Sequence, residues 1–326
     1  MRHPFSSLFF AAATLAAAPP ASAQTWVSSG GLEAGFGAAV AVGDGEVFVA
    51  EATNRFRSGV VYIYRKATNG TWTERAQLKA SSSALRDRFG RAIAVDGTTL
   101  VISSQSADSG AAGMIHVFSR GANGSWAETG MIHAPAGAPG DQFGTSLALR
   151  GDELLVGAPG SAGGAGAIFT FRRTGGRWMP GTTLRATGGK PGDGLGATLV
   201  YSGPHLLAGT PTADSARGGL VHFHNAAGTW AQAPIPSMEG LTANARLGSA
   251  MAVLDNRIWV GAPRLGEGGT VLEFSMAQGA GPATPLSRFD GLPNAALGSA
   301  LAVTSEGLWV GAPGGRGVGG QVHLHR

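Results

Sequence analysis

Residues 143–159 read FGTSLALRGDELLVGAP, a stretch that opens on Phe143-Gly144 and ends on Gly157-Ala158-Pro159. Two short apolar runs lie between these ends, and the tight polar turn Gly151-Asp152 separates them. A turn of this kind reverses the chain and brings two extended segments side by side. The stretch therefore predicts the first two strands of an antiparallel sheet.

The same stretch recurs along the chain. A Phe-Gly or Leu-Gly dipeptide begins units near residues 36, 89, 143, 195, 247 and 297, at steps of 53, 54, 52, 52 and 50 residues. The end of the second apolar run always follows at the same distance, so the segment admits no insertion. Each unit continues to a third strand with alternating apolar residues, as in residues 61–64, and to a fourth that often opens with Trp. Repeats of four short antiparallel strands with this period are typical of β-propeller blades.

Hairpin turns separate the third strand from the fourth. The dipeptides Asn69-Gly70 and Asn123-Gly124 are strong signals for a two-residue turn. Such a turn requires positive φ at both positions, which Asn and Gly tolerate. We therefore predict two-residue turns with positive φ at both residues of each dipeptide.

The two ends of the mature chain are expected to share one blade. The last unit stops after its third strand, at residues 322–326, and Thr25-Trp26 resembles the openings of the fourth strands. An N-terminal strand that completes the last blade would pair two otherwise exposed strand edges. We predict this closure of the ring.

These units resemble the FG-GAP repeat, and residues 24–326 are similar as one domain to the N-terminal β-propeller of integrin α subunits and its bacterial relatives. The resemblance implies an all-β fold whose loops bind protein or carbohydrate, with catalysis not the usual role. Integrin propellers have seven blades, but six units are counted here, so we predict a six-bladed β-propeller. The calcium loop of the family is missing, because no turn between first and second strands holds three carboxylates. We expect no metal and no cofactor.

Residues 1–23 have the features of a secretory signal peptide, with an apolar run from Leu8 to Ala18 and the small residues Ala21-Ser22-Ala23 before the expected cleavage. The protein is therefore expected to be exported, to the periplasm or the extracellular space, without membrane insertion after cleavage. The chain has no cysteine, which excludes disulfides and thiolate metal sites. A net charge of +4 is too weak to indicate nucleic-acid binding.

Histidine and tryptophan positions favour packing over chemistry. The pairs His222/His224 and His323/His325 occupy third-strand positions that are aromatic or apolar in other repeats, so we interpret them as packing between blades and not as metal ligands. Five tryptophans share one repeat position, which also indicates packing. No Ser/His/Asp constellation appears with a recognisable spacing.

The longer loops are the expected binding surface. Chain direction puts the loops after the second strands and the linkers between units on one face, and long loops on a rigid scaffold are where binding usually occurs. Arg and exposed aromatic residues are enriched at interface hot spots. The predicted partner-binding residues are Arg55, Phe56, Arg57, Arg86, Arg88, Arg217 and Arg264.

The functional prediction that follows is a non-catalytic exported scaffold, not an enzyme, that binds a protein partner or a larger exported assembly through this face. A carbohydrate-binding propeller is the first alternative. An enzyme acting on polysaccharides, a lyase or a hydrolase, is the second. Fold alone does not decide among them.

Overall fold

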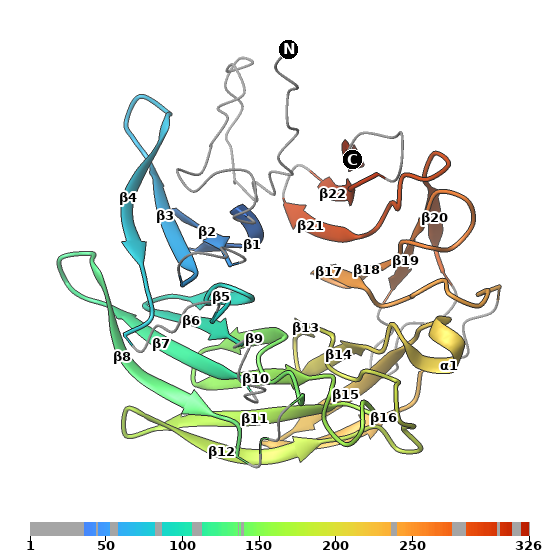
Figure 1. The fold of residues 1–326 in the computed structure, drawn as a ribbon, viewed down its shortest axis with the longest axis horizontal. Helices are drawn as coiled ribbons and strands as arrows, with labels where there is room; N and C mark the ends of the chain where they lie inside the picture. The colour runs from blue at the N-terminus through green and yellow to red at the C-terminus, as the bar shows by residue number, and fades with distance from the viewer. Residues whose placement is uncertain are drawn as a thin grey trace. The chain divides into compact units, whose positions relative to one another are not determined.

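The structure is a computed structural model, and it is drawn in Figure 1. It describes residues 36–43, 45–52, 58–81, 87–105, 113–135, 137, 140–235, 240–275, 285–304, 307–314 and 321–325.

Each sequence repeat forms one antiparallel sheet, with its strands in chain order across the sheet. The first sheet contains β1 (Phe36–Gly43), β2 (Glu46–Glu51), β3 (Val60–Lys66) and β4 (Trp72–Leu78). The second contains β5 (Ile93–Asp96), β6 (Thr99–Ser104), β7 (Met114–Arg120) and β8 (Trp126–His133). The third contains β9 (Ser146–Arg150), β10 (Glu153–Ala158), β11 (Ala167–Thr174) and β12 (Arg177–Leu184).

The last three repeats follow the same plan. The fourth sheet contains β13 (Thr198–Ser202), β14 (His205–Gly209), β15 (Leu220–Ala226) and β16 (Thr229–Ala233). The fifth contains β17 (Ala250–Leu254), β18 (Arg257–Ala262), β19 (Thr270–Ser275) and β20 (Ser287–Asp290). The described part of the sixth contains β21 (Ala300–Thr304), β22 (Gly307–Ala312) and β23 (Gln321–His325). The prediction of an all-β, six-bladed β-propeller is confirmed.

A single short helix, α1 (Ala213–Ala216), interrupts the described strands and lies in the loop between β14 and β15. Three of its four residues, Asp214, Ser215 and Ala216, have positive φ, so α1 is a tight turn more than a regular helix.

The chain divides into two compact units, and the division runs through the third sheet. Among the described residues, one unit holds those up to Val156 together with Thr170–Gly181, and the other holds Gly157–Phe169 together with those from Thr182 onward. In the former, the first strands β1, β5 and β9 contact one another in order. In the latter, β13, β17 and β21 do the same. Small side chains such as those of Ala250 and Ala252 in β17 allow these inner strands to approach closely.

The core lies between neighbouring sheets. All six residues of β2 and all six of β6 are buried. Between the first and second sheets, Phe48 and Ile63 pack against Phe89, Leu100 and Phe118. Full burial of one such side chain stabilises the fold by about 1.5–3 kcal/mol. The opening Phe or Leu of five repeats belongs to this core, since Phe89, Phe143, Leu195 and Leu247 are 0% exposed and Leu297 is 3% exposed, whereas Phe36 is only partly buried.

The backbone around this Phe or Leu explains the fixed length of the repeat segment. The Gly90 and Gly248 N–H groups donate to the carbonyls of Ser103 and Gly261 at 3.0 Å each, which closes the hairpin between first and second strands. Gly90 has a φ of 94°, and a Cβ there would lie 2.8 Å from the Cβ of Ala50. Only glycine fits this position. An inserted residue would break the hydrogen bond or move the aromatic side chain out of the core.

The turns between third and fourth strands differ from the prediction. Gly70 and Gly124 have positive φ, but Asn69 and Asn123 do not. Each Asn Oδ1 instead accepts the backbone N–H two residues later, from Thr71 at 3.1 Å and from Ser125 at 3.0 Å. The loops are therefore one residue longer, with a left-handed glycine at the end, because the Asn side chain gains a hydrogen bond that a two-residue turn would not provide.

Two terminal predictions concern residues that are not described. Residues 1–23, the predicted signal peptide, and residues 24–35, the predicted closing strand, lie outside the described residues. At the other end, β23 is the third strand of its sheet, as expected. Closure of the last blade by the N-terminal strand stays a prediction.

Two glycines of one loop provide a test of close sheet packing. Gly163 and Gly166 both have positive φ, but a Cβ at Gly163 would meet open space, whereas one at Gly166 would collide with the backbone of Leu195. We expect Gly163→Ala to lower the free energy of unfolding by about 1–2 kcal/mol through backbone strain alone. Gly166→Ala should cost at least about 2 kcal/mol more, because Leu195 must move. Urea denaturation of both variants measures the difference, and equal losses would contradict the close approach.

Candidate functional site

The structure describes three of the seven predicted partner-binding residues. Arg55, Phe56, Arg57 and Arg86 lie outside the described residues. Arg88 is exposed in the unit that contains the first two sheets. Arg217 and Arg264 are exposed in the other unit, where Arg217 Nη1 lies 2.9 Å from Asp214 Oδ2. The predicted common binding face therefore stays a prediction.

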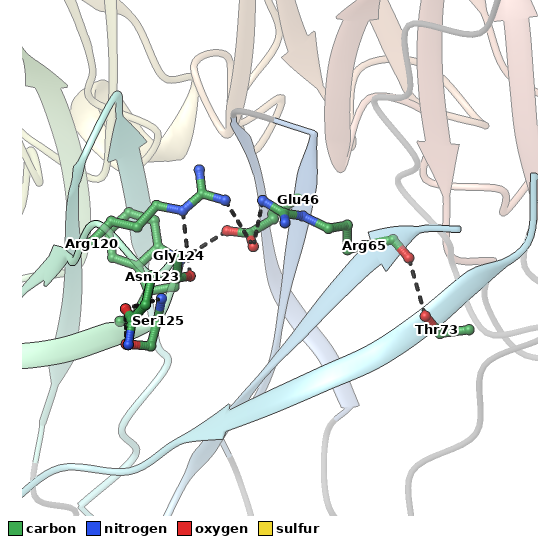
Figure 2. A network of polar contacts seen from close by, with 8 residues as sticks. Glu46, Arg65, Thr73, Arg120, Asn123, Gly124 and Ser125 are labelled. Carbon is green, nitrogen blue, oxygen red and sulfur yellow. Dashed lines mark hydrogen bonds and ion pairs between the residues drawn. The ribbon is translucent and has the colours of Figure 1, made fainter. Parts of the chain in front are cut away.

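A buried carboxylate closes the junction between the first and second sheets (Figure 2). Glu46, at the start of β2, has a side chain that is only 5% exposed. Its Oε1 lies 3.4 Å from Arg65 Nη2 and 3.3 Å from Arg120 Nη2, and its Oε2 accepts the indole N–H of Trp126 at 2.9 Å. The Trp126 ring also packs edge-on against Phe48, with centroids 5.6 Å apart. We name this arrangement the closed junction. The indole N–H of Trp126 has its hydrogen-bond acceptor there.

The corresponding junction between the second and third sheets is built differently. Thr99 occupies the repeat position of Glu46, ten residues after the opening Phe, and it is buried. Arg173, the equivalent of Arg120, donates from Nη1 to Thr99 Oγ1 at 2.9 Å and from Nε to Asp152 Oδ1 at 2.7 Å. Its guanidinium carbon lies 5.5 Å from the ring centroid of Trp178. Thr99 is too short to reach the indole, so within the described residues the Trp178 N–H has no hydrogen-bond partner.

An open groove of about 530 Å³ lies at this second junction. Strands β7 and β8 form one wall, and the turn from β11 to β12 forms the other. The lining residues are Val117, Ser119, Thr129, Gly130, Met131, Ile132, Arg173, Gly176, Arg177 and Trp178. Thr129 is the extra residue of a β-bulge, because Gly130 faces Val117 and Glu128 faces Phe118. The bulge widens the wall, and Gly130 leaves space that a side chain would fill.

The groove presents donors and one aromatic ring. None of its lining residues is acidic. Arg177 is exposed and forms no ion pair with any described residue. The hydroxyls of Ser119 and Thr129 lie 3.2 Å apart, and Thr129 Oγ1 donates to the Val117 carbonyl at 3.3 Å. A volume of this size is within the range of small-ligand sites. The arrangement suits a ligand with an apolar face and negatively charged acceptors.

The sequence did not identify this site. From the sequence we interpreted Trp178 as a packing residue, because five tryptophans share its repeat position. Arg173 and Arg177 were not among the predicted binding residues. The available signal was the change from Glu46 to Thr99, which removes the acceptor that closes the equivalent junction.

Three histidines meet in the fourth sheet. His205 Nδ1 lies 2.9 Å from His222 Nε2, and the ring of His224 stacks 4.8 Å from that of His205. Burial and the neighbouring imidazoles lower the pKa of His205 and of His222. Among the described residues, no group of three His, Asp or Glu side chains is placed to hold a metal ion. In the sixth sheet, His325 packs on Phe289, with ring centroids 4.3 Å apart.

Sequence comparison identifies the repeats. Residues 72–118 and 126–171 match the FG-GAP repeat family, as the sequence resemblance implied. No curated protein sequence matches the chain. No helix among the described residues is long and apolar enough to cross a membrane.

Solved structures share the fold at low identity. A protein from Lactobacillus plantarum is 13% identical, with a TM-score of 0.56 over 89% of this chain and 83% of that one. The periplasmic gluconolactonase PpgL of Pseudomonas aeruginosa is 16% identical, with a TM-score of 0.58 over 88% of this chain and 80% of that one. Identities this low show a common fold and no more.

The gluconolactonase corrects one prediction. The sequence led us to predict that the chain is not an enzyme, on the ground that catalysis is unusual in the resembling family. That prediction is wrong, because a protein with the same kind of fold is a lactonase by name. A propeller scaffold positions side chains rigidly at its loops and between its blades, and such positions serve catalysis as well as binding.

The closed junction makes a prediction about stability. Glu46→Gln removes the charge that two arginines share, and it leaves Arg120, whose side chain is only 13% exposed, without its anion. We expect a loss of about 2 kcal/mol in the free energy of unfolding. Asp214→Asn is the matched control, since its ion pair with Arg217 is 69% and 47% exposed, and it should cost less than about 1 kcal/mol. Equal losses in chemical denaturation would show that Glu46 is not a structural anchor.

The histidine cluster makes a prediction about pH. In the unfolded chain the imidazoles titrate near a pKa of about 6.5, whereas burial and the neighbouring imidazoles lower the pKa of His205 and of His222 in the folded protein. The unfolded state therefore binds more protons below that pH, and the free energy of unfolding falls as the pH falls. His222→Ile, which copies the equivalent residue Ile63 of the first sheet, should reduce this dependence between pH 7.5 and 5.5. An unchanged pH dependence of the melting temperature would contradict the assignment.

Proposed function

We propose that this protein, which carries FG-GAP repeats, is an exported binding protein that holds a carboxylated carbohydrate in the groove at the junction of its second and third sheets. One observation carries the proposal. The same repeat position holds Trp126 in the closed junction and Trp178 in the groove, yet only Trp126 has its N–H satisfied and its ring packed on Phe48. Both rings are half-buried, but the fold satisfies the indole N–H only at Trp126, so the N–H of Trp178, which has no partner among the described residues, supports a role in binding.

The lining chemistry favours a uronate-containing sugar. One face of a sugar ring is apolar and stacks on an indole, and Trp178 lies half-buried with the Arg173 guanidinium above its ring. Arginine binds a carboxylate through two parallel hydrogen bonds, and Arg177 is available for this contact. The hydroxyls of Ser119 and Thr129 and the indole N–H match the hydroxyl groups of a sugar. A neutral sugar would leave the charge of Arg177 without a counterpart, whereas Arg173 already pairs with Asp152.

Export is part of the proposal. It is supported by the features of residues 1–23 as a signal peptide, and polysaccharides with carboxylates are ligands that an exported protein meets. Binding to an anionic polymer should weaken with salt, because the contacts at the mouth of the groove are exposed.

A protein partner bound through the long loops is the second candidate function. The observation in its favour is the exposure of Arg88, Arg217 and Arg264 in the described parts of those loops. Triple substitution of Arg55, Phe56 and Arg57 by Ala should weaken capture of such a partner while leaving sugar binding unchanged.

Titration calorimetry with oligogalacturonate tests the groove. Arg177→Gln should weaken binding by about 10- to 100-fold, since a hydrogen bond to a charged group contributes about 1.5–3 kcal/mol. Gly130→Leu should abolish binding, because its side chain would enter the open space of the groove without meeting any described atom at its Cβ. Trp178→Ala should weaken binding by at least about tenfold.

Arg172→Gln is the matched control. Arg172 is exposed on β11 and loses the same charge, but it does not line the groove. The affinity of the Arg172→Gln variant for oligogalacturonate should stay within about twofold of that of the parent protein. Equal losses for Arg172→Gln and Arg177→Gln would indicate general charge attraction and would contradict a defined site, as would equal binding of a neutral oligosaccharide.

A further inference from the structure

A chain of buried polar groups crosses the second sheet. Ser104 ends β6, His116 lies on β7 and Glu128 lies on β8. Ser104 Oγ is 3.0 Å from His116 Nε2, and His116 Nδ1 is 2.8 Å from Glu128 Oε1. The backbone N–H of Ser81 donates to the other carboxylate oxygen of Glu128 at 2.8 Å. The imidazole is 1% exposed and its ring meets Phe89 edge-on, with centroids 5.2 Å apart.

These contacts fix the direction of each proton. Burial alone would raise the pKa of Glu128, but the hydrogen bonds from His116 and Ser81 outweigh it and lower the pKa. An ionised carboxylate only accepts hydrogen bonds, so Nδ1 of His116 carries the proton between them. Nε2 is then the acceptor and faces the Ser104 hydroxyl, which donates to it. Nucleophile, base and orienting acid therefore stand in the order that nucleophilic catalysis requires.

The fold does not need this chain of groups. In the third and fifth sheets the positions of Ser104 and His116 hold the apolar pairs Ala158 with Phe169 and Ala262 with Leu272. In the first sheet they hold Glu51 and Tyr62, a carboxylate and a phenol joined by a hydrogen bond of 2.8 Å. The three-membered arrangement belongs to the second sheet among these four. Ser104 stands where the chain leaves the strand, and 7% of its surface remains exposed.

We propose that Ser104 and His116 are catalytic residues that hydrolyse short-chain carboxylic esters, with Glu128 as the positioning residue. Ser104 Oγ bonds to the ester carbonyl carbon while its proton passes to His116 Nε2. The bond to the alcohol oxygen then breaks, and His116 returns the proton to the leaving alcohol. Water, deprotonated by His116, attacks the acyl group, releases the carboxylic acid and restores Ser104. This proposal does not depend on the carbohydrate groove.

The full mature protein and p-nitrophenyl acetate provide the test. Ser104→Ala copies the alanine of the third and fifth sheets, so folding should be retained, and hydrolysis should fall by at least about 100-fold. Ser202→Ala removes a hydroxyl from the fourth sheet and should leave the rate unchanged. Equal rates for the parent protein and Ser104→Ala, at equal melting temperature, would overturn the proposal.

Two further measurements separate catalysis from structure. A fluorophosphonate probe should modify Ser104 in the parent protein, as located by peptide mass spectrometry, and absence of modification would overturn the proposal even if Ser104→Ala failed to fold. Glu128→Gln should lower kcat by about tenfold or more with little change in KM, and it should shift the acidic limb of the pH–rate profile, because the carboxylate stabilises the imidazolium. A structural role for Glu128 would leave that limb in place.

Discussion

A hydrogen bond between the glycine of the Phe-Gly or Leu-Gly dipeptide and the carbonyl near the end of the second strand holds the first hairpin closed in the second, fifth and sixth sheets, and the packing between sheets relies on it. In the second sheet it joins Gly90 to Ser103, and in the fifth it joins Gly248 to Gly261. It closes the first hairpin and aims the adjacent Phe89 or Leu247 into the core between sheets. At Gly90, only glycine tolerates both the positive φ and the close approach of Ala50. Steric constraints therefore explain why glycine follows the opening Phe or Leu.

This constraint leaves other positions free to vary. Ten residues after the opening Phe or Leu stand Glu46, Thr99, His205 and Arg257 in four different sheets. Glu46 closes a junction, Thr99 leaves a groove, His205 joins an imidazole cluster, and Arg257 pairs with Glu273 at 3.0 Å. The repeat position is the same in each case, so the chemistry found there changes with the side chain at that position. A repeat scaffold can therefore hold different sites without a change of fold.

Buried polar groups connect stability with function in this chain. A buried carboxylate or imidazole is tolerated only where partners replace water, as they do around Glu46 and around His116. The same partners fix protonation states and orientations. The contacts of the closed junction therefore stabilise the packing of two sheets. The ordered contacts of Ser104, His116 and Glu128 are instead suited to proton transfer.

Sequence alone was enough to predict the repeat and the strand pattern of each unit, because these follow from local periodicity and from turn chemistry. It missed the turn at Asn69-Gly70, where a side-chain hydrogen bond lengthens the loop. The tertiary structure was needed to place the acceptor of the Trp126 indole N–H, since Glu46 lies eighty residues earlier and in another sheet. It also brought Ser104, His116 and Glu128 together from three strands. Contacts between strands are set by register and packing across the sheets, and no local pattern encodes them.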